Sequence, residues 1–174
     1  MAKTYNGPFS DVATGDVYTA AAHNLVLENL NNHRVPPMCS VYRTAALSHT
    51  ATGTYQVYTY DTELYDTDSM WDAGSPTRIT LNTAGVYDVK FVVSLGNTTG
   101  LIAGAIYKDG GAYQFLFLDA GQATANYKSG STNVVSTGST YIEAYFYQAS
   151  GGSLNYNVGL TQSLFSATWI GQAS

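Results

Sequence analysis

The feature that most constrains how this 174-residue chain can fold is an alternation of apolar and polar residues. Between residues 87 and 95 apolar side chains occupy every second position, and Asp88 and Lys90 lie between them. Residues 141–147 repeat the pattern, and one side of that segment consists of Ile142, Ala144 and Phe146. Because successive side chains of a strand point to opposite faces, each segment predicts a strand with one buried face.

Similar short segments follow one another along most of the chain. Asp109-Gly110 predicts a hairpin turn, because this pair readily supplies the positive φ angles that tight turns require. The strand that returns from it, 112–118, is expected to place Tyr113, Phe115 and Phe117 on one face. Further strands are expected at 38–44, 55–60, 77–81, 100–107, 123–128, 155–162 and 166–170. Such closely spaced strands and turn signals predict an all-β fold, a sandwich or barrel.

A different composition precedes Pro36-Pro37, so the chain divides into an N-terminal arm (1–37) and a β domain (38–174). Thr19 followed by three alanines predicts the start of a short α-helix, which should end near His33 because proline disfavours helix before it. So short a helix is marginal alone and must pack on something. The apolar side chains expected to dock the arm are Phe9, Val17, Leu25, Leu27 and Leu30.

Charged residues are scarce, and this excludes several partners. They make up 11% of the chain, and its seven lysines and arginines leave a net charge of −5. Nucleic acid and anionic membranes are therefore not expected partners, because both need clustered basic residues. The first thirty residues lack the basic and apolar regions of a signal peptide, and a product made in the cytoplasm is expected. The single cysteine, Cys39, is interpreted as a small buried hydrophobe.

Four segments resemble, in order, conserved segments of the complement globular-head and tumour-necrosis-factor superfamily. Ile79-Thr80 with 83–89 (Thr-Ala-Gly-Val-Tyr-Asp-Val) is similar to its "Thr-x-x-Gly-x-Tyr-x-Phe/Val" motif. Upstream, 65–72 resembles its "Tyr-Asp/Asn … aromatic" segment. Downstream, 138–144 and 163–170 resemble its "Gly-Asp-x-Val-x-Val" strand and its closing strand. The resemblance covers about residues 38–172 and implies a two-sheet antiparallel jelly roll that assembles as a compact homotrimer.

Three tyrosines are the candidate trimer interface. Tyr141, Tyr145 and Tyr147 share the side of their strand opposite to Ile142 and Phe146, so an inward Phe146 places them outward. Tyrosine is favoured at interfaces because it buries a large ring while keeping a polar tip. The alternative is that Tyr145 and Tyr147 belong to the core of the second sheet.

The arm carries a second resemblance. Gly15-Asp16-Val17-Tyr18-Thr19-Ala20, followed by Asn24, is similar to the "Gly-x-x-hydrophobic-Thr-Ala-x-x-x-Asn" opening of many tailed-bacteriophage virion proteins. Such openings often precede a fibre, spike or decoration domain. The resemblance therefore implies a virion protein, made in the bacterial host cytoplasm, whose partners are capsid or tail proteins.

An acidic loop is the main candidate for chemistry. Asp66, Asp68 and Asp72 lie close together beside Trp71, so a calcium site, a glycosidase-like carboxylate pair and a polar loop with turn-capping aspartates are all open interpretations. Trp71 is also a candidate glycan contact. The three histidines, His23, His33 and His49, show no catalytic or zinc-binding spacing.

The sequence thus favours a non-enzymatic structural virion protein, a trimeric capsid decoration or head fibre anchored by its arm. A tail or baseplate fibre that recognises a host-surface glycan is the alternative, with loops near 97–100 and 129–132 as candidate contacts. A polysaccharide depolymerase is the third and least favoured hypothesis. No cofactor is expected, apart from calcium at the acidic loop.

Overall fold

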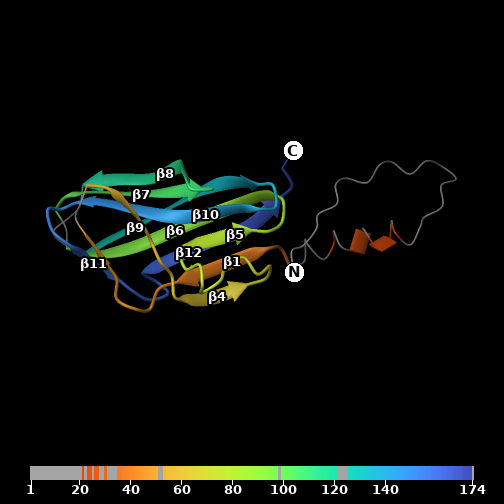
Figure 1. Ribbon diagram of the computed structural model, residues 1–174, viewed down its shortest axis with the longest axis horizontal. Helices are drawn as coiled ribbons and strands as arrows, with labels where there is room; N and C mark the ends of the chain where they lie inside the picture. Colours follow the sequence, from red (N-terminus) through yellow and green to blue (C-terminus); the bar gives the residue numbers. More distant parts are fainter. Residues whose placement is uncertain are drawn as a thin grey trace.

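The computed structural model describes residues 35–50, 53–97, 99–120 and 125–173, together with single residues between 21 and 30. In this part, twelve strands form two antiparallel sheets stacked face to face (Figure 1). The predicted two-sheet antiparallel jelly roll is therefore confirmed at the level of the β domain.

The larger, seven-stranded sheet is built around one long strand, β6, which spans Gly85–Asn97. On one edge β6 pairs with β12 and β11, and on the other with β9 over almost its whole length. Beyond β12 the sheet continues through β1 to β4. The remaining strands are β1 (Met38–Tyr42), β2 (Ser48–His49), β4 (Thr62–Asp66), β9 (Ala125–Ser136), β11 (Leu154–Asn157) and β12 (Ser163–Gly171).

The five-stranded sheet is organised in the same way around β10, which spans Thr140–Ala149. One edge of β10 pairs with β7 (Leu101–Lys108), and β7 in turn pairs with β8 (Gly111–Ala120). The other edge pairs with β3 (Tyr55–Val57) and β5 (Arg78–Leu81). β8 is therefore an edge strand whose only backbone pairing in the described structure is to β7.

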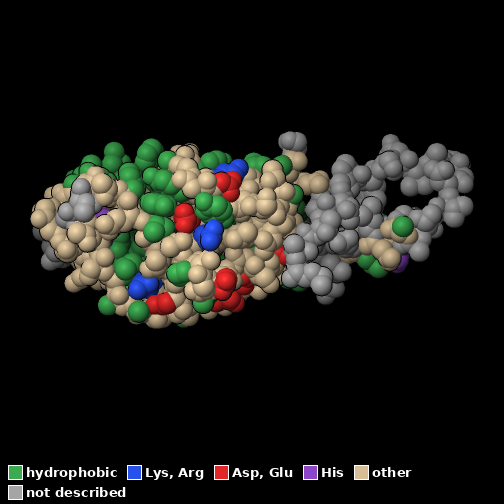
Figure 2. Space-filling model, viewed as in Figure 1, with side chains coloured by type: hydrophobic (Ala, Val, Ile, Leu, Met, Phe, Trp, Pro, Cys, Tyr) green, Lys and Arg blue, Asp and Glu red, His purple; other side chains and the backbone are tan. Residues whose placement is uncertain are grey.

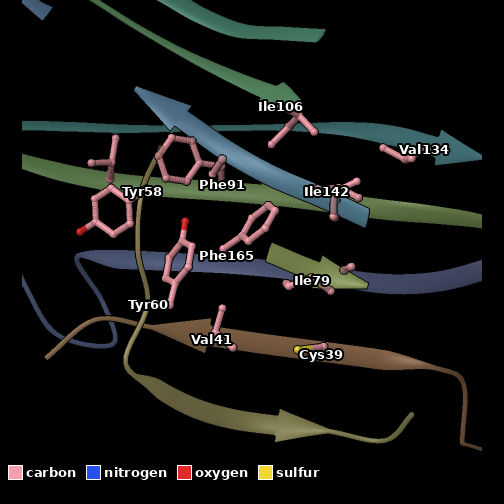
Figure 3. Close-up of a cluster of buried hydrophobic side chains, with 14 of the residues drawn as sticks. Cys39, Val41, Tyr58, Tyr60, Ile79, Phe91, Ile106, Val134, Ile142 and Phe165 are labelled. Atoms are coloured by element: carbon pink, nitrogen blue, oxygen red, sulfur yellow. The ribbon is translucent and has the colours of Figure 1, made fainter. Parts of the chain in front are cut away.

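The inward sides of the two central strands fill the core. Phe91 of β6 and Phe146 of β10 are both fully buried, and Phe165 of β12 joins them. Figure 3 shows Phe91 and Phe165 with Tyr58 and Tyr60 of the segment between β3 and β4, all directed into one cluster. Both alternating segments lie within these central strands, and the predicted one-sided burial is confirmed for 141–147 and 87–91, whereas Val92 and Ser94 on the other side of β6 are buried as well.

Three expectations for the strands need correction. The strand expected at 123–128 runs on to Ser136, so residues 129–132 are strand and not the predicted loop. The strand expected at 155–162 ends at Asn157, and β4 was not predicted. β8 does not place its three aromatic residues on one face, because its pairing with β7 is interrupted by two register shifts.

The N-terminal arm is outside most of the described structure. Phe9, Val17 and Leu25 lie outside the described residues, and the short helix is not confirmed. Leu27 and Leu30 are exposed, and their role in docking stays a prediction. Among the described residues, no helix is long and apolar enough to cross a bilayer.

Two buried tyrosines provide a matched test of the core. Tyr60 is buried against Phe165, and its hydroxyl has no hydrogen-bond partner among the described residues. Tyr87 is equally buried, but its hydroxyl donates a 2.8 Å hydrogen bond to the carbonyl oxygen of Thr83. A buried hydroxyl without a partner costs free energy, whereas a paired one contributes about 1 kcal/mol.

We therefore expect Tyr60→Phe to leave the free energy of unfolding unchanged or to raise it, and Tyr87→Phe to lower it by about 1 kcal/mol. Denaturant unfolding of the two variants beside the wild type measures both changes. Equal destabilisation by the two substitutions would contradict this account of the core.

Candidate interaction surfaces

The outward side of the five-stranded sheet is lined with aromatic rings. Tyr141, Tyr145 and Tyr147 of β10 alternate with buried residues and are themselves half-buried, so they point outward as predicted. Three further rings from β3, β7 and β8 lie on the same side of the sheet. We use the name outer aromatic face for Tyr55, Tyr107, Phe115, Tyr145 and Tyr147.

These rings pack on one another. The centroids of Tyr107 and Tyr145 are 3.8 Å apart with nearly parallel planes. The ring of Tyr55 lies 5.3 Å from that of Tyr147 and 5.9 Å from that of Phe115. The alternative placement of Tyr145 and Tyr147 in the core is therefore excluded, and their half-burial comes from neighbouring rings.

Small residues lie beneath the rings. Ala105 pairs with Tyr145 and Ala103 with Tyr147, so both alanines belong to the outward side of β7. Each is nevertheless only 1% exposed, because larger side chains cover it. The outer aromatic face is thus a second apolar layer on the outside of the sheet.

Charged groups are confined to one end of this surface. Glu143 accepts a 2.7 Å hydrogen bond from the hydroxyl of Thr77, and the guanidinium of Arg78 lies 5.2 Å from the ring centroid of Tyr141. Partial burial, with smaller contributions from Glu143, Tyr107 and Tyr141, raises the pKa of Tyr145. The phenol of Tyr145 is therefore uncharged at neutral pH.

The adjoining edge of the sheet is strongly apolar and exposed. Phe115 and Leu118 of β8 are 61% and 69% exposed, and Tyr113 is also exposed. Figure 2 shows hydrophobic side chains gathered along this edge of the molecule. A long, exposed apolar edge strand is a site where another chain can add or pack. We call Tyr113, Phe115 and Leu118 the β8 edge.

Side chains, and not a backbone ladder, connect β8 to β9 of the other sheet. Lys128 forms an ion pair with Asp119, and the hydroxyl of Tyr113 donates a 3.0 Å hydrogen bond to the carbonyl oxygen of Asn133. The two sheets are therefore joined along this side while the edge of β8 stays open.

The outward side of the seven-stranded sheet carries a separate apolar patch. Tyr127 and Val135 of β9 are exposed, and Val135 pairs with the half-buried Val86. Ile170, near the end of β12, is 55% exposed. We call Val86, Val135 and Ile170 the β9 patch, and Tyr127 lies eight residues from Val135 on the same side of β9, outside this patch. The patch lies on a different sheet from the β8 edge.

The acidic loop is held by its own aspartates. The carboxylate of Asp66 accepts hydrogen bonds from the backbone N–H groups of Asp68, Met70 and Trp71 at 2.6–3.0 Å. Asp68 is buried and accepts a 2.9 Å hydrogen bond from the Thr83 hydroxyl, and Asp72 accepts one from the N–H of Gly74. These contacts agree with the polar-loop interpretation.

No group of three or more acidic, histidine or cysteine side chains in the described residues could hold a metal ion. Calcium binding at Asp66, Asp68 and Asp72 therefore stays a prediction, because these carboxylates do not form a cluster of ligands in the structure. Trp71 is half-buried against the core, and its indole N–H is buried without a partner among the described residues. Its predicted role as a glycan platform also stays untested, and Trp71 is not part of the outer aromatic face.

The sequence did not reveal a buried polar contact at the edge of the core. His49 of β2 is 1% exposed, and its Nδ1 lies 2.7 Å from the hydroxyl of Tyr156. The ring of Phe146 packs edge-on against it, and Nε2 has no hydrogen-bond partner among the described residues. Burial lowers the pKa of His49 to about 4.

His49 should make stability depend on pH. In the unfolded chain it takes up a proton near pH 6.5, whereas in the folded protein it stays neutral down to about pH 4. Stability is therefore expected to fall as pH drops from about 7 to about 4, by up to about 3 kcal/mol from this group. His49→Gln should make the free energy of unfolding vary less between pH 7 and pH 4. The other two histidines are unchanged in this variant, so the difference from the wild type reports on His49 alone. Parallel slopes for variant and wild type, measured by denaturant unfolding at several pH values, would refute this assignment.

Comparison with known proteins supports the fold. No family model and no curated protein matches the chain. Among solved structures, the globular domain of zebrafish complement 1qA is similar at 18% identity, covering 79% of this chain and 99% of its own, with a TM-score of 0.58. Murine APRIL matches at 9% identity, covering 77% and 98%, with a TM-score of 0.58. Eiger TNF from S. frugiperda matches at 10% identity, covering 79% and 94%, with a TM-score of 0.55. The resemblance seen in the sequence is thus confirmed as a shared jelly-roll fold.

Proposed function

We propose that this chain is a non-enzymatic structural protein of a bacteriophage virion, a homotrimeric capsid decoration or head fibre anchored through residues 1–37. The β domain has the jelly-roll fold of complement globular domains and tumour-necrosis-factor ligands. The superfamily resemblance implies a trimer, and the opening of the arm resembles those of virion proteins. Capsid or tail proteins are the proposed partners, and the virion is the proposed location.

Two exposed apolar surfaces support the proposal that the chain associates with itself. The β8 edge and the β9 patch lie on different sheets, and each exposes large apolar side chains. Exposed apolar patches of this kind are typical of contact sites. A contact between two different surfaces of identical chains is head-to-tail, and when its rotation closes it forms a ring. A closed ring of three would cover both surfaces on every chain.

The acidic loop supports the non-enzymatic part. The carboxylate of Asp66 accepts hydrogen bonds from three backbone N–H groups, and the buried carboxylate of Asp68 accepts one from the Thr83 hydroxyl. Carboxylates held in this way stabilise a loop and are poorly placed to act as a general acid and base. The depolymerase hypothesis therefore gains no support from this loop.

A charge placed on the β8 edge should dissociate the trimer. Light scattering of the wild type in dilute solution should give about 56 kDa, three times the 18.6 kDa of one chain. Leu118→Asp would bury a carboxylate in the contact, so its mass is expected to fall toward that of the monomer. Leu160→Asp is the matched control, because Leu160 is 44% exposed and lies in neither surface. A monomeric wild type would refute the proposal.

The arm should be needed for attachment but not for folding. Every residue of the buried core cluster lies between Cys39 and Trp169. A chain that begins at Val35 is therefore expected to remain a trimer with the thermal stability of the full-length protein while failing to bind particles. Co-sedimentation with virus particles that lack the protein measures this. Full-length protein that does not sediment would contradict the virion assignment.

A tail or baseplate fibre that contacts a host-surface glycan is the second candidate. The observation that favours it is the outer aromatic face, which is distinct from the β9 patch and has no role in the proposed contact apart from Phe115. Detection of the protein in isolated tails, and not in isolated heads, would select this candidate.

A further inference from the structure

We propose that the outer aromatic face is a binding site for neutral glycan chains, with pyranose rings stacking on Tyr55, Tyr107 and Tyr145. The inference rests on the proposed function in one respect, because the trimer must leave the four tyrosines of this face uncovered, while Phe115, which also belongs to the β8 edge, enters the subunit contact.

The rings are fixed before any ligand arrives. Tyr107 and Tyr145 stack on each other, and Tyr55 bridges Tyr147 and Phe115 across the sheet. Ala103 and Ala105, on the same side of the sheet, are buried, as expected if these rings cover them. Binding to side chains that are already ordered loses little conformational entropy, so even weak stacking contacts can give measurable affinity.

The chemistry of the face matches that of a sugar. Each tyrosine offers an apolar ring and a polar tip, and a pyranose likewise has a C–H face surrounded by hydroxyl groups. The hydroxyls of Tyr55, Tyr107, Tyr145 and Tyr147 make no hydrogen bonds with other described residues. They are therefore available to a ligand whose rim is rich in hydroxyl groups.

The charge distribution favours a neutral glycan over an acidic one. None of the five residues of the face is charged. Glu143 lies on the same side of β10 as Tyr145, two residues away, and contributes to its raised pKa. A carboxylate at this position repels an anionic sugar. A neutral sugar is not repelled, and it binds without removing a charge of its own from water.

A second copy of this chain is a less suitable occupant. Tyr107, Tyr145 and Tyr147 are already half-buried by neighbouring rings, so covering them removes less apolar area from water than covering the β8 edge or the β9 patch. Leu118 at 69% and Phe115 at 61% belong to the β8 edge, and Tyr127 at 57% lies on the other sheet, whereas the four tyrosines of the face are all half-buried. Self-association therefore has better surfaces available.

Affinity electrophoresis of the full-length protein tests the site. Native gels contain glycogen, hydroxyethylcellulose or xyloglucan as neutral probes and polygalacturonate as the acidic one. We expect at least one neutral polymer to retard the protein and polygalacturonate to leave it unaffected. Tyr145→Ser should weaken retardation about tenfold, and Tyr145→Phe should keep most of it, because stacking needs the ring. Tyr127→Ser, on the opposite sheet, is the control and should bind as the wild type.

Three binding results overturn the inference. Lack of retardation by every neutral polymer, equal retardation by polygalacturonate, or unchanged binding by Tyr145→Ser would each show that the face is not this site. A lower mass of Tyr145→Ser in light scattering would instead make the face a subunit contact, as the sequence first suggested. A monomeric wild type that still binds the neutral polymer would overturn the trimer and leave the site intact, so the two failures are distinguishable.

Discussion

The structure depends on the packing of one face of β6 against one face of β10. The inward residues of both strands interdigitate around Phe91 and Phe146, and the strands beside them extend the same layer. Because the period of a strand is two, this arrangement fixes which side chains point outward. The tyrosines of β10 cannot enter the core without displacing Phe146 from it. The outer surfaces are therefore a direct consequence of how the core is filled.

The outward faces of the two sheets differ in the residues that they carry. On the seven-stranded sheet, the outward residues of β9 include Ser129, Ser131 and Asn133, which are exposed to water. On the five-stranded sheet the outward positions of β10 are mainly aromatic, and the small residues Ala103 and Ala105 of β7 leave room for their rings to lie across the sheet. The same fold thus presents a largely polar face with one apolar patch and a continuous aromatic face.

The parts of the fold that could be predicted from sequence are those in which alternation is most regular. Residues 87–95 and 141–147 carry their pattern into β6 and β10, and the outward direction of Tyr145 followed from it. The prediction failed in β8, because register shifts opposite β7 turn Phe117 toward the core and Phe115 outward. Alternation cannot reveal a bulge, since a bulge depends on how two strands pair.

The other features that the sequence did not predict also depend on contacts between segments that are distant in the chain. The polar residues 129–132 suggested a loop, yet pairing with β6 holds them in a strand, where Gly130 allows the close approach of Leu116. His49 and Asp68 have polar partners far away in sequence, Tyr156 and Thr83, so neither burial could be seen locally. The outer aromatic face was only partly foreseen, because Tyr55 and Phe115 reach it from strands on opposite sides of β10 and β7.

The position of β8 explains how one domain can present two kinds of contact surface. Its residues Phe115 and Leu118 pair with Ala105 and Ala103 and lie on the outward side, where Phe115 completes the aromatic face, while Tyr113 reaches toward β9. The ion pair of Asp119 with Lys128 ties this strand to β9 without using the backbone groups of its edge. Those groups and the apolar side chains beside them are best satisfied by another protein chain. The half-buried tyrosines, whose exposed tips are polar, are better suited to a ligand that is itself part apolar and part hydroxylated.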